Sequence, residues 1–187
     1  MILTDREIQI IIEQKLIIVD PPPTEKAYSS TTVDFSLDEN ISEFLDQLPG
    51  REIIINPTDP NFNHEAILKE ITRTVTISEK GYVLNPGQMI LAWTKEYINL
   101  NINARIAARV EGKSSLARLG IGVHITAPII HAGFDGQIRL EMTHHGKLPV
   151  RLKTGMRICQ LCFEQTLGTP VRGYVGRFTG QTSSKMG

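Results

Sequence analysis

The residues best suited to chemistry gather in one stretch, residues 112–141. Near its start, Ser114 and Ser115 stand between the cations Lys113 and Arg118, and a helix beginning there would add free backbone N–H groups. Hydroxyls, N–H groups and cations together suit the oxygens of a phosphate. The same serines would also serve as a plain helix cap, so the pattern alone leaves both interpretations open.

The same stretch ends with a carboxylate, Glu141, which follows the alternating run Ile138-Arg139-Leu140. If Leu140 faces the core of a sheet, Glu141 lies on the opposite face. A walled pocket on that face would raise the pKa of the carboxyl group into a range useful for proton transfer. On a solvated face Glu141 would be an ordinary strand residue, and the pattern alone favours that interpretation.

Cysteine and histidine are placed poorly for metal chemistry. Cys159 and Cys162 fall in a strand pattern, where residues three apart point to opposite faces, and there is no second cysteine pair. No histidine falls in a His-Glu-x-x-His frame, and the directly adjacent His64 and Glu65 do not have the spacing of zinc-dependent nucleobase deaminases. We therefore expect no zinc, and we interpret both cysteines as packing residues.

The bulk composition fits a single soluble domain. The chain has 187 residues, enough for one substantial core, with 41% hydrophobic and 21% charged residues. Its formal net charge is zero, so we expect neither nucleic acid nor a membrane as partner. No secretory signal or spanning segment is predicted, and two cysteines fit a reducing compartment, which indicates the cytoplasm. After Glu141 the chain is basic, which favours an anionic substrate.

The hydrophobic periodicity predicts many short strands and little helix. Thr4 and Glu7 form a capping box that predicts a short amino-terminal helix, and a second short helix is expected over residues 41–48. A helical piece is also expected over residues 114–119. Strands are expected over residues 32–37, 74–77, 82–84, 89–93, 106–110, 150–152 and 156–163.

Short strands at close spacing indicate a compact antiparallel barrel or jelly-roll sandwich. Residues 1–168 are expected to form one domain. Residues 169–187 are rich in glycine, threonine and serine, and are expected to form a mobile tail.

Four motifs occur in an order and spacing that resembles dCTP deaminase, a family of the dUTPase-like superfamily. They span residues 112–120, 123–127, 132–141 and 155–161, and include Ser-Ser-Leu-Ala-Arg and Gly-Phe-Asp-Gly-Gln-Ile-Arg-Leu-Glu. The resemblance implies a mainly β fold, a distorted jelly-roll or β-barrel of the dUTPase-like type with a short amino-terminal helix. It also implies a homotrimer with active sites between subunits.

The resemblance further implies that the protein converts dCTP to dUTP and ammonia without zinc, supplying dUTP and dUMP for thymidylate synthesis. Glu141 would be the general base, Ser114 would hold the attacking water, and Arg118 would steady the base and the developing charge. Ala127 would contact cytosine through its backbone, and Phe134 would pack near the deoxyribose. The other implied substrate-binding residues, most of them at the triphosphate and its Mg²⁺, are Lys113, Ser115, His131, Gln160, Tyr174, Arg177 and Gln181.

Several features depart from the pattern of the family, among them Arg177 at a position usually held by lysine and a short loop between Tyr174 and Gln181. His131 stands where the family has aspartate at the sugar, and Lys113 stands where arginine is usual.

The altered positions leave a nucleotide-binding paralogue without activity open as an alternative. A dUTPase, or a bifunctional enzyme that takes dCTP to dUMP, also stays open, because residues 172–180 loosely resemble the glycine-rich tail of dUTPases, although His131 argues against it. The expected ligands are dCTP as substrate and dTTP as a candidate inhibitor, and the tail is expected to close over the nucleotide.

Overall fold

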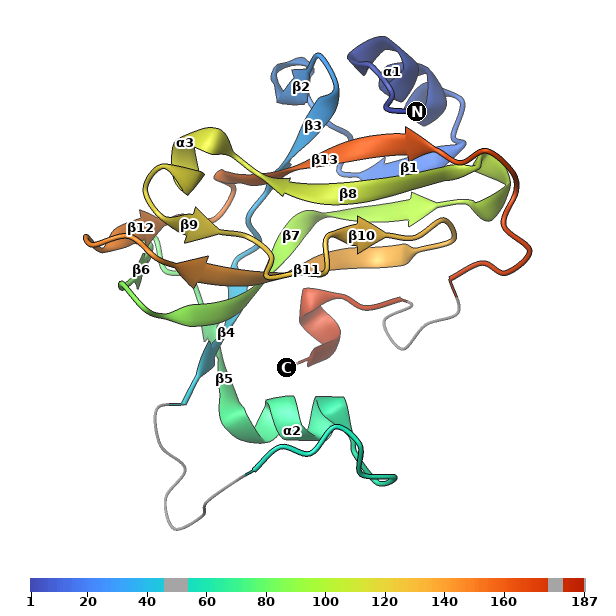
Figure 1. Ribbon diagram of the computed structural model, residues 1–187. Helices are drawn as coiled ribbons and strands as arrows, with labels where there is room; N and C mark the ends of the chain where they lie inside the picture. Colours follow the sequence, from blue (N-terminus) through green and yellow to red (C-terminus); the bar gives the residue numbers. More distant parts are fainter. Residues whose placement is uncertain (46–53, 175–179, 187) are drawn as a thin grey trace.

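The computed structural model describes residues 1–45, 54–174 and 180–186, and consists mainly of two β-sheets packed face to face (Figure 1). One sheet has the order β5 (Thr72–Thr76), β4 (Asn40–Phe44), β7 (Met89–Leu100), β11 (Asp135–His144) and β9 (Ile121–Gly122), with β1 (Ile17–Asp20) also paired to β7. The other has the order β10 (Ile129–Ile130), β8 (Ile106–Gly112), β13 (Arg157–Gln165), β3 (Thr32–Ser36) and β2 (Tyr28–Ser29).

The remaining elements lie around these sheets. A small separate ribbon pairs β12 (Val150–Leu152) with β6 (Tyr82–Leu84), and three short helices are present, α1 (Asp5–Glu13), α2 (His64–Ile71) and α3 (Ser114–Ala117). Turns of 3₁₀ helix cover Glu25–Ala27, Ile102–Ala104 and Ser183–Met186. In Figure 1, α1 lies on the side of β13 and β3, whereas α2 lies on the opposite side, beyond β11.

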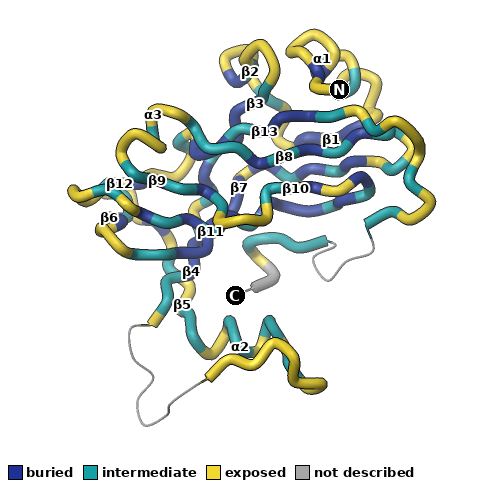
Figure 2. The backbone as a smooth tube through the Cα atoms, in the orientation of Figure 1, coloured by how far each residue is buried: buried dark blue, intermediate teal, exposed yellow. Residues whose placement is uncertain are grey.

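The core fills the space between the two sheets. Large apolar side chains from both sheets are fully buried, among them Phe35, Leu140 and Phe163, and Figure 2 shows buried residues running along the facing strands. Cys159 and Cys162 are free and buried within β13. Both cysteines therefore pack in the interior, as the sequence predicts.

The amino-terminal helix forms where the capping box predicts it. Thr4 is the N-cap of α1, with its side chain bonded to Glu7, and the Glu7 carboxylate accepts the Thr4 backbone N–H at 3.2 Å. Leu3 and Ile8 are both buried, as expected of the apolar pair that flanks such a box. The predicted strands are also present, although several of them are longer than expected.

The short helix predicted over residues 41–48 is wrong, as far as the structure describes that segment. Asn40–Phe44 forms β4, which pairs with β5 along its whole length and with β7 at Ser42 and Glu43. Hydrogen bonding to two neighbouring strands outweighs a weak local preference for helix. Residues 46–48 of that prediction lie outside the described residues.

The prediction of a mainly β fold with a short amino-terminal helix is confirmed. Within the described residues the strands do not close into a barrel, because both large sheets keep open edges. The architecture is therefore the sandwich form that the jelly-roll prediction allowed. No helix in the described part of the chain is long and apolar enough to cross a membrane.

Candidate active site

The floor of the candidate site is formed by β11 and its antiparallel neighbour β7. The pairing of β7 with β11 shifts at an irregularity in β7. Gln137 pairs with Tyr97, whereas Arg139, only two residues further on β11, pairs with Trp93, four residues away on β7. The Ile138 N–H donates to the Thr94 hydroxyl at 3.0 Å, which fixes the irregularity. Such bulges re-aim side chains beside functional sites.

Beyond the irregularity, alternate residues of the two strands face the same way. Arg139 lies opposite Trp93 and Glu141 lies opposite Leu91, while Leu140 on the other face is buried in the core. The strand pattern therefore turns Glu141 away from the core, as predicted.

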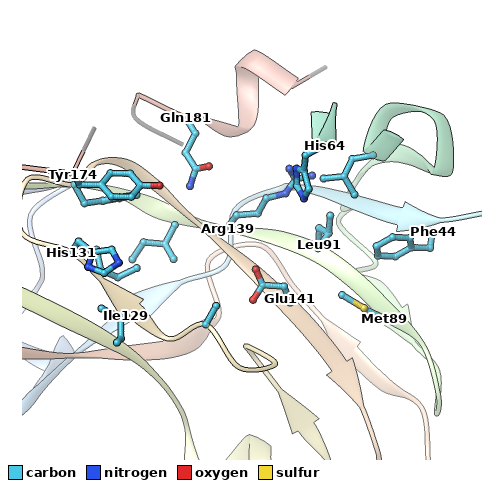
Figure 3. Close-up of a pocket in the computed structure, with 15 residues that line it drawn as sticks. Phe44, His64, Met89, Leu91, Ile129, His131, Arg139, Glu141, Tyr174 and Gln181 are labelled. Atoms are coloured by element: carbon cyan, nitrogen blue, oxygen red, sulfur yellow. The ribbon is translucent and has the colours of Figure 1, made fainter. Parts of the chain in front are cut away.

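A cavity of about 430 Å³ lies over this floor. Figure 3 shows Glu141 projecting into it from β11, with His131 and Tyr174 toward one end and Phe44 and Met89 toward the other. Six residues predicted from the sequence to form the site line this one cavity: Ala127, His131, Phe134, Glu141, Tyr174 and Gln181.

Glu141 is half-buried in this cavity, and its environment alters its protonation. Burial raises the pKa of the carboxyl group, opposed by hydrogen bonds from its own backbone and the Ile125 backbone, and by the nearby His124 and Arg139 side chains. Since burial outweighs these effects, Glu141 holds its proton to a higher pH than an ordinary glutamate. A carboxyl group of that kind can both accept and return a proton.

Aromatic rings close the end of the cavity near His131. The imidazole of His131 stacks on the Tyr174 ring with centroids 5.8 Å apart, and Phe134 contacts the same ring at 5.9 Å. The Tyr174 N–H donates to the Ala132 carbonyl at 3.1 Å. Gly133 permits this approach, because a Cβ there would lie 2.7 Å from the Tyr174 nitrogen.

The described end of the tail is bonded to β11 beside the same cavity. The Gln137 N–H donates to the Gln181 carbonyl at 3.0 Å, and the Gln181 side-chain amide donates to the Gln137 carbonyl at 2.9 Å. The Ser183 N–H donates to the Gln137 side chain at 2.7 Å. Tyr174 and Gln181 therefore reach the cavity on either side of residues 175–179, a range outside the described residues that contains the predicted site residue Arg177.

The phosphate-like motif lies apart from this cavity within the chain. Ser114 and Ser115 begin α3, where both are exposed, and Arg118 follows at the end of that helix, also exposed. Arg118 lines a separate open depression together with Lys147 and Arg151. The structure therefore does not bring these three residues to Glu141 within one chain.

Lys113 and Gln160 are held by contacts inside the protein. The Lys113 ammonium is paired with the buried carboxylate of Asp34, which also lies 3.3 Å from the Arg157 guanidinium. The Gln160 side chain accepts from the Thr32 hydroxyl at 2.7 Å and donates to the Gly112 carbonyl at 2.9 Å. These contacts anchor the start of α3 to β3 and β13, and the substrate roles of both residues stay predictions.

Several cavity residues were missed by sequence reasoning. Arg139 lies two residues before Glu141 on the same strand face, so the alternation that singled out Glu141 also applied to Arg139. His64 and Leu68 come from α2, and Phe44 comes from β4, where a helix had been expected. The searched part of the chain contains no cluster of three histidine, cysteine or acidic residues that could hold a metal ion.

Comparison with known proteins places the chain in a family. Residues 2–166 match the dCTP deaminase-like family, and the chain belongs to it. Among curated relatives, the dUMP-forming dCTP deaminase of Methanosphaera stadtmanae is 37% identical, covering 99% of this chain and 92% of the relative. The dCTP deaminase of Shewanella loihica is 38% identical, covering 91% of this chain and 86% of the relative.

Solved structures share the fold. The crystal structure of 2′-deoxycytidine 5′-triphosphate deaminase from Agrobacterium tumefaciens matches with a TM-score of 0.66 at 21% identity, over 88% of this chain and 48% of that chain. A variant of the dUTPase of Staphylococcus bacteriophage 80alpha matches with a TM-score of 0.50 at 10% identity, over 86% of this chain and 96% of that chain. The predicted dUTPase-like fold is thereby confirmed.

Proposed function

We propose that this protein is a dCTP deaminase that hydrolyses the exocyclic amine of dCTP to give dUTP and ammonia. One observation carries the proposal: among the described residues that line the cavity, Glu141 is the single carboxylate, and burial raises its pKa. A group of this kind suits a reaction in which one base takes a proton from water and returns it to the substrate.

The chemistry follows from the position of Glu141. Its carboxylate takes a proton from a water that attacks C4 of cytosine, and passes the proton to N3. The proton left on the attacking oxygen then moves through the Glu141 carboxylate to the amino group, so that the bond from C4 to the exocyclic nitrogen breaks, ammonia leaves and the C4 carbonyl of uracil remains. Ala127 and Phe134, both at the cavity wall, would contact the base and the deoxyribose. His131 beside Phe134 would offer a ring nitrogen to the sugar hydroxyl.

We further propose a homotrimer in which each site is completed by a neighbouring subunit. The separation of exposed α3 from the Glu141 cavity supports this arrangement, because Ser114 and Arg118 would otherwise act far from the proposed base. In the assembly, Ser114 would hold the attacking water and Arg118 would steady the developing charge. Lys113 and Ser115, at the start of α3, and Gln160, on β13, would come from the same subunit as Ser114 and Arg118.

The triphosphate is proposed to bind with Mg²⁺ under the carboxyl-terminal tail. Phosphate oxygens would supply most of the ligands of the metal ion, so no dedicated carboxylate cluster is needed. Tyr174, Arg177 and Gln181 would reach the phosphates when residues 169–187 close over the domain formed by residues 1–168. dTTP would compete for the same cavity, and the protein would act in the cytoplasm.

A second candidate activity takes dCTP through to dUMP. The names of relatives such as that of Methanosphaera stadtmanae favour it. Against it, the lining of the cavity offers His131 where a second carboxylate would orient a water for attack on phosphorus.

Incubation of the purified protein with dCTP and Mg²⁺, followed by chromatography of the nucleotides, decides between the two activities. Ammonia with dUTP and no pyrophosphate is the expected result. Equal release of ammonia and pyrophosphate with dUMP would establish the second activity instead. If dCTP is bound without turnover, the protein is a nucleotide-binding paralogue and the proposed function is wrong.

A further inference from the structure

Arg139 lies closer to the proposed chemistry than the family resemblance suggested. It lies on the same face of β11 as Glu141, two residues away, and both side chains line the cavity. Its guanidinium carbon lies 5.0 Å from the centroid of the Trp93 ring, directly opposite on β7. Trp93 is itself only 2% exposed, so the cation covers a buried ring.

The stack on Trp93 restricts where this cation can go. A guanidinium over an indole face gains from cation–π attraction, and more when the pair is shielded from water. Arg139 is half-buried, and burial lowers its pKa, opposed by the nearby carboxylates Glu65 and Glu141. Arginine nevertheless stays protonated at any working pH. A fixed positive charge therefore accompanies Glu141.

Other ionisable groups face the same space from each surrounding element. Figure 3 shows the Arg139 side chain pointing toward His64 on α2. His64 is followed by Glu65, whose carboxylate lies 3.4 Å from the His64 ring. The β7 side offers the uncharged Met89 and Leu91. Within the described part of the chain, the ionisable groups that face Glu141 or line its cavity are Arg139, His124, His64, His131 and Tyr174, with Glu65 behind Arg139.

We propose that Arg139 is a positioning residue for the general base: its guanidinium, held over Trp93 on the strand face that also carries Glu141, is a fixed positive charge that favours the ionised form of the Glu141 carboxylate. The proposal rests on the role of Glu141 in the proposed deaminase. Arg139 and Glu141 lie two residues apart on one face of β11 and line the same cavity, a nearby cation favours the ionised form of an acid, and partial burial weakens the screening by water. Arg139 would act through Glu141 and not on the substrate.

Two substitutions separate the charge from the packing. Arg139→Met keeps much of the apolar stem over Trp93 and removes the charge, whereas Arg139→Lys keeps a cation at the same position. The expected result for Arg139→Met is that the acid limb of the pH profile of kcat moves to higher pH. The rate on that limb should fall roughly threefold to tenfold, and should approach the wild-type rate at high pH. Arg139→Lys should stay near wild type.

A second readout needs no turnover. Carbon-13 NMR of the glutamate carboxyl groups, with Glu141 assigned by the loss of its signal in Glu141→Gln, follows its titration directly. The titration should move to higher pH in Arg139→Met and stay in place in Arg6→Met, a loss of charge on the exposed face of α1. Absence of deamination by the wild-type protein would remove the proposed function and leave this measurement valid.

Two results would overturn the inference. One is an unchanged Glu141 titration and acid limb in Arg139→Met. The other is an equal shift in Arg139→Met and Arg139→Lys, which would mean that the shape of the side chain matters and its charge does not.

Discussion

Two regions of this molecule carry the predicted chemistry, and they are built differently. Around Glu141, a strand pair, α2, an aromatic cluster and the described end of the tail surround a cavity. Around α3, Ser114, Ser115 and Arg118 project from an exposed turn with open space before them. In the first region burial raises the pKa of Glu141, whereas the second region presents its side chains outward.

The Glu141 region and the α3 region also differ in the contacts that stabilise them. Glu141 lies on a strand that is paired on both sides in a sheet, with the buried Leu140 beside it in the core. The helix α3 is held in place at its N-cap, where Lys113 pairs with Asp34. An exposed element held firmly at its base is well suited to meet a second surface, as the proposed trimer requires of α3.

The largest effect on the rate of deamination is expected from a substitution of Glu141 in the cavity. Glu141→Gln removes the proposed base and keeps the shape of the side chain, so the rate of deamination should fall about a thousandfold. The matched control is Glu164→Gln on β13, where the glutamate pairs with Arg109 at 2.8 Å, away from the cavity. Ammonia release measures both variants. Full activity in Glu141→Gln would rule out the mechanism.

Mixing two inactive variants tests whether the regions meet across subunits. Glu141→Gln and Arg118→Ala should each be nearly inactive alone. If they are unfolded and reassembled together in equal amounts, about a quarter of the sites should receive both intact halves, and activity should recover to that fraction.

The matched control for this mixing is Ser114→Ala with Arg118→Ala. Both defects then lie on α3, so every site contains one of them and no recovery is expected. Absence of recovery in the first mixture would place the whole site within one chain, whereas recovery in the control would mean that Ser114 and Arg118 reach a site from different subunits.

The anchor of α3 should matter for stability. Asp34→Asn removes the buried charge that pairs with Lys113 and Arg157, both of which keep some contact with water, so the free energy of unfolding should fall by about 1–3 kcal/mol. Urea denaturation measures the change. Asp59→Asn, in an exposed turn where the side chain accepts the Asn61 N–H, should change stability little. Equal effects would mean that the Asp34 pair does not hold this corner.

The smallest effect is expected from the cost of charging Glu141. Burial raises its pKa in the folded protein above that in the unfolded chain, so stability is lost as the pH rises through the folded pKa. The neutral Glu141→Gln should therefore melt higher than wild type at neutral pH, by roughly 1–3 °C. The gap should close in acid. A variant that melts lower at neutral pH would contradict this sign.

The sequence predicts this fold well where the signal is local. The box of Thr4 and Glu7 determines where α1 begins, and alternation locates β3, β8 and β13. It fails at Asn40–Phe44, because pairing with β5 and β7 is a property of the sheet and leaves little trace in five residues. It also missed α2, whose Asn63 cap accepts the Ala66 N–H at 3.1 Å but precedes a helix without a buried residue.

In the candidate site, as in the fold, the sequence predicted the residues whose signal is local and missed a contact between distant parts of the chain. Glu141 could be proposed because its motif is contiguous, and its place on the strand face followed from alternation. The approach of Arg139 to Trp93 could not, because it depends on the irregularity that shifts β7 against β11. A contact that arises from the register between two strands far apart in the sequence cannot be predicted from the order of residues alone.

The attachment of the tail to β11 has a practical consequence for handling the protein. The tail places Gln181 at the cavity, and the last turn, Ser183–Met186, lies between β11 and α2 (Figure 1). The amino terminus lies on the far side of the molecule, where the Leu3 N–H donates to the Phe163 carbonyl at 3.0 Å. An affinity tag fused to the carboxyl end would lie beside the cavity, whereas a tag on the amino end would lie away from it.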